Sequence, residues 1–352
     1  MDRRTFLVTT TAAAATTTVV ADSAAAREQQ VTAPAIVSGL QQLTFSSAWT
    51  ADVPVFGDMA IDLNNRLQTA LGDRYSIVVR PDAMTESDLI FSTPDAIAPS
   101  ELGFAFFDGL PGSLGLSAHE HQAWLTVGGG QMLWDDLSTP HGWKPLLAGH
   151  TGPAPGLWTN RAIHSKDNLA GCNIGSFGPD RRVVHAIGAT PVELPPAELT
   201  AALHQGRLGA AAWGNPLAAL MLGLPNAASH YYRGGIRPAG TVLALNVRAG
   251  LWDQFSASDR AIFEGVAASM FAISVAEAQA HHRLALDAVV QSAPALTIAD
   301  LPAAVSGAID QIVVHTVSDI AAGSPDNMRI RQSFDAFSQL MRGPETRAMA
   351  TS

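Results

Sequence analysis

The sequence predicts an α/β protein, in which strands and helices alternate along most of the chain. Apolar residues recur at helical spacing over 58–71, and strand-like apolar runs lie on either side, at 43–49 and 75–79. A strand–helix–strand unit favours a parallel sheet, because parallel strands need a crossover connection. The composition allows one large domain or two lobes around a sizeable core, since 47% of the 352 residues are hydrophobic and 15% are charged.

Local signals predict the helices of the first half. Ser117 is an expected N-cap, and Glu120 stands at the capping-box position, so we expect a helix over 117–125. The glycines at 128–130 interrupt it, and a second helix is expected over 131–137. The other segments predicted here are apolar runs at 89–91 and 104–107 and extended segments at 143–147 and 156–159.

The second half continues the alternation. A helix is expected over 196–205, with Gly206 as its stop. A long helical stretch is expected over 251–290, with a start signal inside it at 256–259. The remaining predictions are helices at 182–187, 309–320 and 328–340 and strands at 191–194, 210–213 and 241–247.

The N-terminus has the pattern of an export signal. Arg3 and Arg4 precede Phe-Leu and a weakly apolar stretch rich in Thr, Ala and Val, and small residues follow at 24–26. The arginine pair indicates the twin-arginine route, which carries folded cargo. An uncleaved membrane anchor is the alternative, but the stretch is short and Thr-rich rather than Leu-rich. We expect a signal peptide over 1–26 and a protein located in the periplasm.

Charge and cysteine content exclude several classes of protein. The formal net charge of -10 argues against a nucleic-acid partner, which needs a basic surface to neutralise phosphates. The single cysteine, Cys172, excludes an internal disulfide and a multi-cysteine zinc site. We expect it to be a small buried residue.

Motifs that could carry catalysis or bind a metal are incomplete. The glycines at 128–130 lack the Lys-Ser/Thr of a phosphate-binding loop, so a turn is the better interpretation. The histidines in 119–121 are two residues apart, whereas a zinc-binding helix needs four, and both they and His281–His282 fit surface pairs. No Gly-x-Ser-x-Gly motif of a serine hydrolase is present. We therefore expect no enzyme activity, no cofactor and no metal site.

A series of short motifs stands in one order along the chain, at 47–49, 116–124, 127–130, 148–152, 156–158, 167–171, 187–195, 210–216, 231–232 and 333–337. Together they resemble the periplasmic substrate-binding subunit of TRAP (tripartite ATP-independent periplasmic) transporters, especially the α-keto-acid-binding branch. The resemblance implies two α/β lobes with a cleft, crossed by a long helix, which closes on a small organic acid. It also implies a membrane permease as partner and points to a homodimer through the helix at 251–290.

The positions that hold the ligand in the family depart from its pattern. The arginine that clamps the substrate carboxylate corresponds to Gly175. A glutamine near a bound cation corresponds to Ala154, and a glutamate corresponds to Ala212. A His-Glu pair is replaced by Arg237 and Pro238. Since polar groups mostly become Ala, Gly or Pro, we expect a roomier and more apolar cleft without a bound cation. A helical segment between 80 and 88 is also missing.

The resulting interpretation is a two-lobed solute receptor over 43–340, with the lobes interleaved in sequence, a linker at 27–42 and a tail at 341–352. We expect its ligand to be a small organic molecule other than a simple carboxylate. The expected ligand-binding residues are the aromatic residues Trp158, Phe177, Trp213, Tyr231 and Tyr232 and the polar residues Asn173, Ser176, Asn215 and Arg237. The simpler alternatives are core packing for Trp213 and a solvated loop position for Arg237.

Two other classes of function remain open at this stage. A degenerate receptor would act as a sensor or interaction protein without a permease, and the lost ligand groups and shortened first lobe favour it. An exported enzyme folded around a cofactor would also use the twin-arginine route, but no catalytic constellation supports it.

Overall fold

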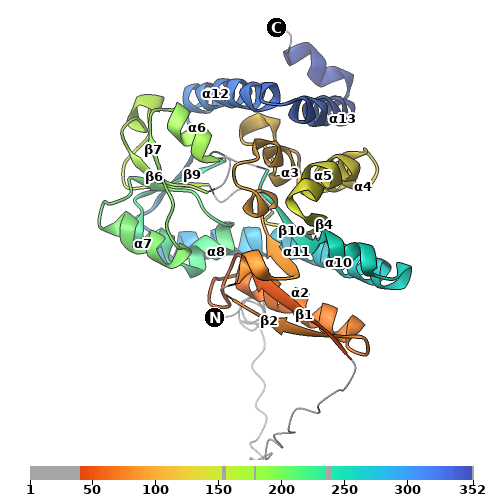
Figure 1. Cartoon of the computed structure of the whole chain (residues 1–352). Coiled ribbons are helices and arrows are strands. Elements are labelled where there is room, and N and C mark those ends of the chain that lie inside the picture. The colour runs from red at the N-terminus through yellow and green to blue at the C-terminus, as the bar shows by residue number, and fades with distance from the viewer. Residues whose placement is uncertain are drawn as a thin grey trace, which may run out of the picture.

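The chain folds into two lobes, each built on one β-sheet and covered by helices (Figure 1). The computed structural model describes residues 40–350 apart from 82, 153–155, 178–179, 235 and 237–238. The predicted signal peptide and most of the predicted linker lie outside the described residues. The α/β class and the two-lobed architecture are confirmed.

The first sheet comprises β1 (Gln41–Ser47), β2 (Tyr75–Val79), β3 (Leu89–Ser92), β4 (Trp143–His150) and β10 (Val242–Arg248). Its strand order is β2-β1-β3-β10-β4. β1 pairs in parallel with β2 and β3, as the strand–helix–strand pattern predicts. β10 runs antiparallel to both β3 and β4, so the sheet is mixed rather than fully parallel. The reason is that β10 enters this sheet from the second lobe and not through a helical crossover within the first.

The second sheet comprises β5 (Leu157–Thr159), β6 (Asn173–Gly175), β7 (Thr190–Val192), β8 (Ala210–Ala211), β9 (His230–Arg233) and β11 (Thr297–Asp300). Its order is β11-β9-β5-β8-β6-β7. β9 and β11 have no clear strand signal in the sequence, and they form because β9 pairs with β5 on one side and with β11 on the other. Pairing between segments distant in sequence thus overrides weak local preference.

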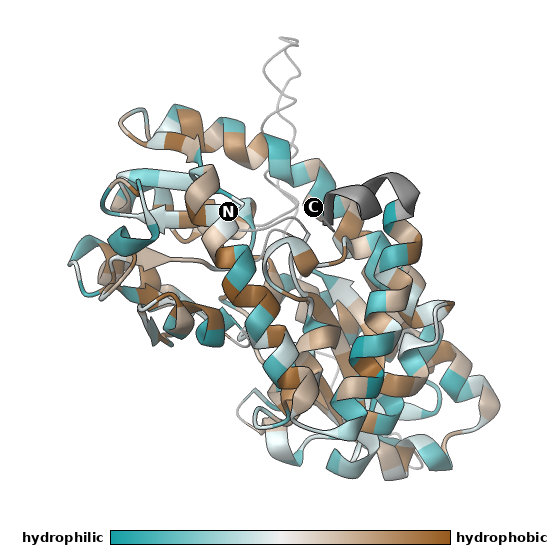
Figure 2. Cartoon of the chain, turned by 90° about the horizontal axis from the view of Figure 1, so that it is seen from above, coloured by the Kyte–Doolittle hydropathy of each residue, from teal (hydrophilic) through white to brown (hydrophobic). Residues whose placement is uncertain are grey.

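The helices are α2 (Phe56–Leu71), α3 (Ala105–Asp108), α4 (Ala118–Thr126), α5 (Gly130–Ser138), α6 (Asp180–Ala186), α7 (Pro196–His204), α8 (Pro216–Met221), α9 (Leu224–Ala227), α10 (Ala249–Gln254), α11 (Ala257–Ser292), α12 (Ala303–Ala322) and α13 (Pro325–Ala350). The predicted capping box of α4 is confirmed, because Ser117 Oγ accepts a hydrogen bond from Glu120 N and the Glu120 carboxylate accepts one from Ser117 N. Hydrophilic and hydrophobic residues alternate along the helices (Figure 2), as expected where one face is buried.

The long helical stretch predicted over 251–290 is two helices, α10 and α11. The predicted start signal is confirmed, since Ser256 Oγ caps α11 by accepting a hydrogen bond from Asp259 N at 3.1 Å. α11 contacts β4, α2 and α8, so it crosses from one lobe to the other. Among the described residues it is also the one helix long and apolar enough, by length and composition, to cross a membrane.

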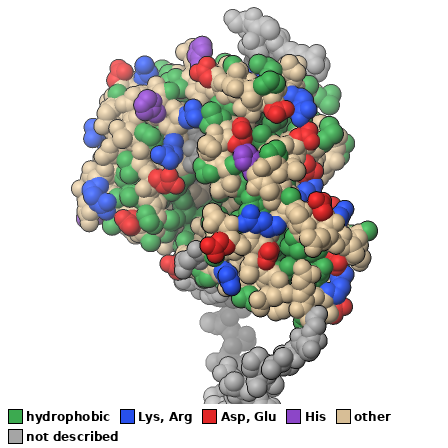
Figure 3. Space-filling model, viewed as in Figure 1, with side chains coloured by type: hydrophobic (Ala, Val, Ile, Leu, Met, Phe, Trp, Pro, Cys, Tyr) green, Lys and Arg blue, Asp and Glu red, His purple; other side chains and the backbone are tan. Residues whose placement is uncertain are grey.

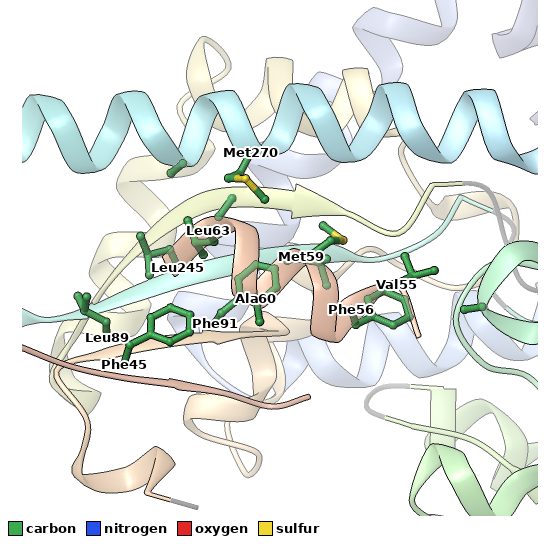
Figure 4. Close-up of a cluster of buried hydrophobic side chains, with 14 of the residues drawn as sticks. Phe45, Val55, Phe56, Met59, Ala60, Leu63, Leu89, Phe91, Leu245 and Met270 are labelled. Atoms are coloured by element: carbon green, nitrogen blue, oxygen red, sulfur yellow. The ribbon is translucent and has the colours of Figure 1, made fainter. Parts of the chain in front are cut away.

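α2 packs against the first sheet and against α11, which itself lies on β4 of that sheet (Figure 4). Its fully buried Leu63 packs in the same cluster as Phe45 of β1 and Phe91 of β3. Met270 belongs to this cluster from the α11 side. The N-terminal end of α2, with Phe56, packs in the same cluster as second-lobe residues. This packing places the start of α2 at the junction of the lobes.

Candidate functional site

A cavity lies where the two lobes meet α11. The cavity and its open mouth enclose about 400 Å³ of empty space. Its lining comes from the start of α2 (Val55, Phe56, Met59), the end of β4 and the next residue (His150, Thr151), the start of α8 (Asn215, Pro216, Leu217) and α11 (Ser274, Glu277, Ala278, His281, His282). Each lobe and the long helix therefore contribute a wall.

The backbone at the rim of the cavity is strained. Val55 has φ 70° and is the only non-glycine residue with a positive φ in the described part of the chain. Its ψ is −54°, and Phe56 N donates a hydrogen bond to Pro54 O at 2.8 Å, which closes a tight γ-turn. A β-branched residue rarely adopts this conformation, and such strain concentrates at functional sites.

Asn215 ties the second lobe to the strand that leaves the first. Its Oδ1 caps α8 by accepting a hydrogen bond from Ala218 N at 2.9 Å, and its Nδ2 donates to Thr151 O at 3.1 Å. Thr151 Oγ1 in turn accepts a hydrogen bond from Thr241 N at 2.9 Å. Asn215 thus has a structural role in addition to its place in the cavity wall.

Histidines and one glutamate give the cavity its polar character. His150 and His281 are almost fully buried. Gly152 N donates to His150 Nδ1 at 3.0 Å, and Ser274 Oγ accepts a hydrogen bond from His150 N at 3.0 Å. Burial lowers the pKa of His282 below its ordinary value. Glu277 is the one acidic residue in this lining.

Two expectations about histidines are wrong. His281 is not a surface residue, because α11 turns it into the cavity between the lobes. His121 is also fully buried and lies beside the Trp124 indole, although His119 is exposed. The described residues contain no group of three or more His, Cys, Asp or Glu side chains that could hold a metal ion.

Three of the predicted aromatic residues lie in the second sheet on two different faces. Trp158 pairs with Tyr231 across β5 and β9, and their rings stack with centroids 4.3 Å apart. Burial raises the pKa of Tyr231 to about 12. Tyr232 points to the opposite face, because successive side chains of a strand alternate, and its hydroxyl accepts a hydrogen bond from Ile163 N. Tyr231 and Tyr232 therefore do not share a wall.

Trp213 joins the lobes directly. It follows β8 in the second lobe, is 7% exposed, and meets Phe56 of α2 edge-on with ring centroids 5.2 Å apart. Phe56 also stacks on Trp49 of the first lobe at 5.3 Å. Phe177 is half-buried against the same cluster. Phe56 therefore contacts Trp213 on one side and lines the cavity on the other.

Gly175, which the resemblance aligns with a substrate-clamping arginine, lies in a tightly packed place. Gly175 ends β6, and a Cβ there would meet Leu199 Cδ2 and Leu208 Cδ1 at 3.1 Å. Ser176 is buried, and its Oγ has no hydrogen-bond partner among the described residues. Asn173 is exposed, and its Nδ2 donates to the backbone oxygen of Arg207. A side chain at Gly175 would therefore need the two leucines to shift by a few tenths of an ångström.

Three other predicted positions lie outside the described residues, and the structure describes Cys172 and the segment between β2 and β3. Arg237, Pro238 and Ala154 lie outside the described residues. Cys172 is buried, as expected. Between β2 and β3 the described residues form a single 3-10 turn, Met84–Glu86, in place of a longer helix.

On the face shown in Figure 3, basic and acidic side chains are interspersed, and the described residues form no continuous basic stripe there.

No family model matches the chain. The monocarboxylate 2-oxoacid-binding periplasmic protein of Nostoc sp. (strain PCC 7120) is 31% identical over 160 residues, which are 46% of this chain and 43% of that protein. The match therefore spans less than half of this relative.

Solved structures resemble most of the chain. A TRAP transporter solute-binding protein from Bordetella bronchiseptica RB50, a dimer with copurified calcium and picolinate, has a TM-score of 0.78 at 22% identity and covers 85% of this chain and 91% of its own. One from Pseudoalteromonas atlantica T6c with bound sodium and pyruvate has a TM-score of 0.79 at 22% identity, covering 86% and 95%. One from Colwellia psychrerythraea with bound calcium and pyruvate has a TM-score of 0.80 at 21% identity, covering 86% and 95%. The chain therefore has the fold of the TRAP transporter periplasmic solute-binding proteins, and its predicted resemblance to them, near those that bind 2-oxoacids, is confirmed.

Proposed function

We propose that the chain is the periplasmic receptor of a TRAP-type secondary transporter and binds a small organic molecule by closure of its lobes. The observation that carries the proposal is the cavity walled by both lobes and α11, since a ligand there contacts every part that must move. The strained turn at Val55 on its rim supports this location. A twin-arginine signal would bring the protein to the periplasm, where it would deliver its ligand to the membrane permease.

We further propose that the ligand is not a simple carboxylate. The solved relatives hold pyruvate or picolinate together with a metal ion. Here the position of the clamping arginine is packed against leucines, and the described lining of the cavity contains no Lys or Arg. Asn215 is the proposed contact within the lining of this cavity, and Trp213, Phe177 and Ser176 are proposed contacts beyond that lining. Arg237 remains a proposed contact from outside the described residues. Trp158 and Tyr231 would pack in the buried cluster that holds Trp213 and Phe56 in place.

A homodimer through α11 is part of this proposal. Small residues are exposed along the helix at Ala261, Gly265, Ala268, Ala272, Ala276 and Ala280. Only 33% of its most apolar window is buried within the chain. Small residues let two helices approach closely, and one solved relative is a dimer.

The second candidate is a degenerate receptor that senses or binds a partner without transport. The packed clamp position and the short turn in place of a helix after β2 favour it. A permease gene next to the gene for this chain would count against it.

The experiment that separates the two candidates is a thermal-shift screen of small organic acids, amines and neutral aromatic compounds, followed by small-angle X-ray scattering with the best compound. A receptor is expected to gain stability and to become more compact as its lobes close. If no compound raises the melting temperature, the degenerate receptor is the better description.

A further inference from the structure

We propose that Thr151 is the positioning residue that sets the angle between the two lobes. Its hydroxyl takes the place of a backbone carbonyl in the first sheet and so frees that carbonyl to bind Asn215 of the second lobe. This inference rests on the proposed closure of the lobes and names the residue through which a bound molecule would act on it. Thr151 directly follows β4, where the chain leaves the first sheet.

The hydrogen bonds between β4 and β10 continue one residue pair beyond the strands. The last strand pair is His150 with Val242, and Thr151 and Thr241 come next. A regular antiparallel pair exchanges two backbone hydrogen bonds. Thr151 N donates the first of them to Thr241 O at 2.9 Å. The second runs from Thr241 N to the side-chain oxygen of Thr151, Oγ1, also at 2.9 Å. The hydroxyl therefore stands where a regular ladder has the carbonyl of Thr151.

The carbonyl of Thr151 binds the second lobe instead. Asn215 Nδ2 donates a hydrogen bond to Thr151 O at 3.1 Å, and Asn215 Oδ1 accepts one from Ala218 N at the start of α8. Thr151 and Asn215 are both buried, so water competes little for the bond between them. Thr151 thus holds the first sheet with its side chain and the second lobe with its backbone.

The backbone next to Thr151 is packed against a second crossing segment and against α11. A Cβ on Gly240, which lies between β9 and β10, would collide with Gly152 O. A Cβ on Gly152 would collide with Ala278 Cβ of α11. Both glycines have a positive φ, of 77° for Gly152 and 86° for Gly240, which a side chain would strain. A rotation of one lobe against the other displaces this tightly packed point least, so we expect the pivot there.

Both partners of the hydrogen bond between the lobes also lie in the wall of the cavity. Thr151 lines it from the end of β4, and Asn215 lines it from the start of α8. A molecule bound in the cavity would therefore touch the two residues that link the lobes at the pivot. Its binding and the lobe angle are coupled through this hydrogen bond.

The test compares variants of the mature protein without any ligand. Thr151→Val keeps the shape of the side chain but removes the hydroxyl, so Thr241 N is expected to turn to Thr151 O and to displace Asn215. Thr151→Ser keeps the hydroxyl and serves as the rescue. Thr159→Val is the matched control, because Thr159 is also buried and its hydroxyl donates to Arg161 O at 2.6 Å within the second lobe.

Small-angle X-ray scattering, after refolding to remove any bound molecule, should give a larger radius of gyration for Thr151→Val than for the wild type, because the lobes are less tightly linked. Thr151→Ser and Thr159→Val should match the wild type. Asn215→Ser keeps a helix-capping side chain but loses the amide that binds Thr151 O, so it should open the lobes as well. The double variant should open them no further, because both changes remove the same link.

Nuclear magnetic resonance of the Asn215 side-chain amide reports on the link itself. Its protons should exchange with solvent at least about tenfold more slowly in the wild type than those of the exposed Asn226, and this protection should be lost in Thr151→Val and kept in Thr151→Ser. Unprotected Asn215 protons in the wild type would overturn the inference without recourse to any variant.

An unchanged radius of gyration in both Thr151→Val and Asn215→Ser would overturn the inference too. So would a Thr151→Ser protein as open as Thr151→Val, because the serine retains the hydroxyl. None of these measurements uses a ligand, so their failure would leave the receptor function intact, and the failure of ligand binding would leave the link between the lobes intact.

Discussion

The ring of Phe56 on α2 meets the indole of Trp213 edge-on, with centroids 5.2 Å apart, and this contact joins the two lobes beside the cavity. Phe56 belongs to the wall of the cavity, whereas Trp213 follows β8 in the second lobe. A ligand in the cavity would therefore contact Phe56, one of the two rings that join the lobes.

Replacement of Trp213 by Leu should weaken ligand binding at least about tenfold, because an aromatic anchor at the junction is lost. The measurement is calorimetry with the compound that stabilises the wild-type protein most. The matched control is Phe334→Leu, because Trp124 and Phe334 form an edge-on pair with the same 5.2 Å separation in the other core cluster. Both variants should lose about 1–3 kcal/mol of stability, but only Trp213→Leu should lose affinity. If the two variants bind the ligand with equal affinity, Trp213 does not take part in ligand binding.

An arginine introduced at Gly175 should fail to restore a carboxylate clamp. Its Cβ would press against Leu199 and Leu208 at 3.1 Å, and overpacking of this kind costs about 1–3 kcal/mol. We expect Gly175→Arg to lower the melting temperature without gaining affinity for pyruvate. Gly307→Ala, where nothing lies within 4 Å of an added Cβ, serves as the tolerant control. A stable Gly175→Arg protein that binds pyruvate would contradict this prediction and would show that Leu199 and Leu208 can move aside.

His282 should make the stability of the protein depend on pH. Burial lowers the pKa of His282 from its ordinary value of 6.5, so the unfolded chain binds the proton more tightly than the folded one. The stability from the neutral ring is therefore present above about pH 6.5 and is lost as the pH falls below it. Melting temperatures measured from about pH 8 to about pH 5 should fall more steeply for the wild type than for His282→Gln. His204→Gln, an exposed histidine, should follow the wild type; parallel curves for all three proteins would exclude this role.

Asp259 should anchor the start of α11 to β2. Its carboxylate accepts hydrogen bonds from Ser256 Oγ at 2.7 Å and Tyr75 Oη at 3.2 Å and pairs with Arg74. Burial alone would raise the pKa of Asp259, but Ser256 and Arg74 outweigh it, and the pKa is lowered. Asp259→Asn should therefore cost about 1–2 kcal/mol of unfolding free energy at neutral pH.

This difference in stability should shrink as the pH falls below the ordinary aspartate value of 3.8, because the stabilising charge is then lost in the wild type too. Chemical denaturation at several pH values measures it. The exposed Asp287→Asn on the same helix should show almost no change at any pH. A pH-independent loss in Asp259→Asn would point to packing rather than charge.

A charged residue on the outward face of α11 should dissociate the proposed homodimer. Ala272 is exposed in the middle of the stripe of small residues, so Ala272→Arg should bring two like charges together at the helix–helix contact. Light scattering coupled to gel filtration should then give the monomer mass. Ala304→Arg, an exposed site on α12, should leave the dimer intact. A wild-type protein that is already monomeric would contradict the proposed pairing.

The sequence was most informative where the determining interactions are local. The caps formed by Ser117 with Glu120 and by Ser256 with Asp259 were predictable, because each links residues three apart. β9 and β11 were not, because their strand conformation depends on pairing with each other and with β5.

The candidate site was only partly predictable. Trp213 and Asn215 could be named from one motif, but no local signal connects His150 of β4 with His281 of α11, which line the same cavity only in the folded chain. The alternation of side chains that separates Tyr231 from Tyr232 follows from β9, so it was missed together with that strand. The packing of Gly175 against Leu199 and Leu208 depends on how α7 lies on the sheet. The residue type at position 175 alone does not reveal these neighbours.

The most direct test of the receptor function is native mass spectrometry of the exported protein purified from its own host, followed by extraction under denaturing conditions. The proposed function predicts a small organic molecule that leaves when the protein unfolds. A protein that carries nothing, and whose melting temperature no small organic compound raises, would contradict the receptor function.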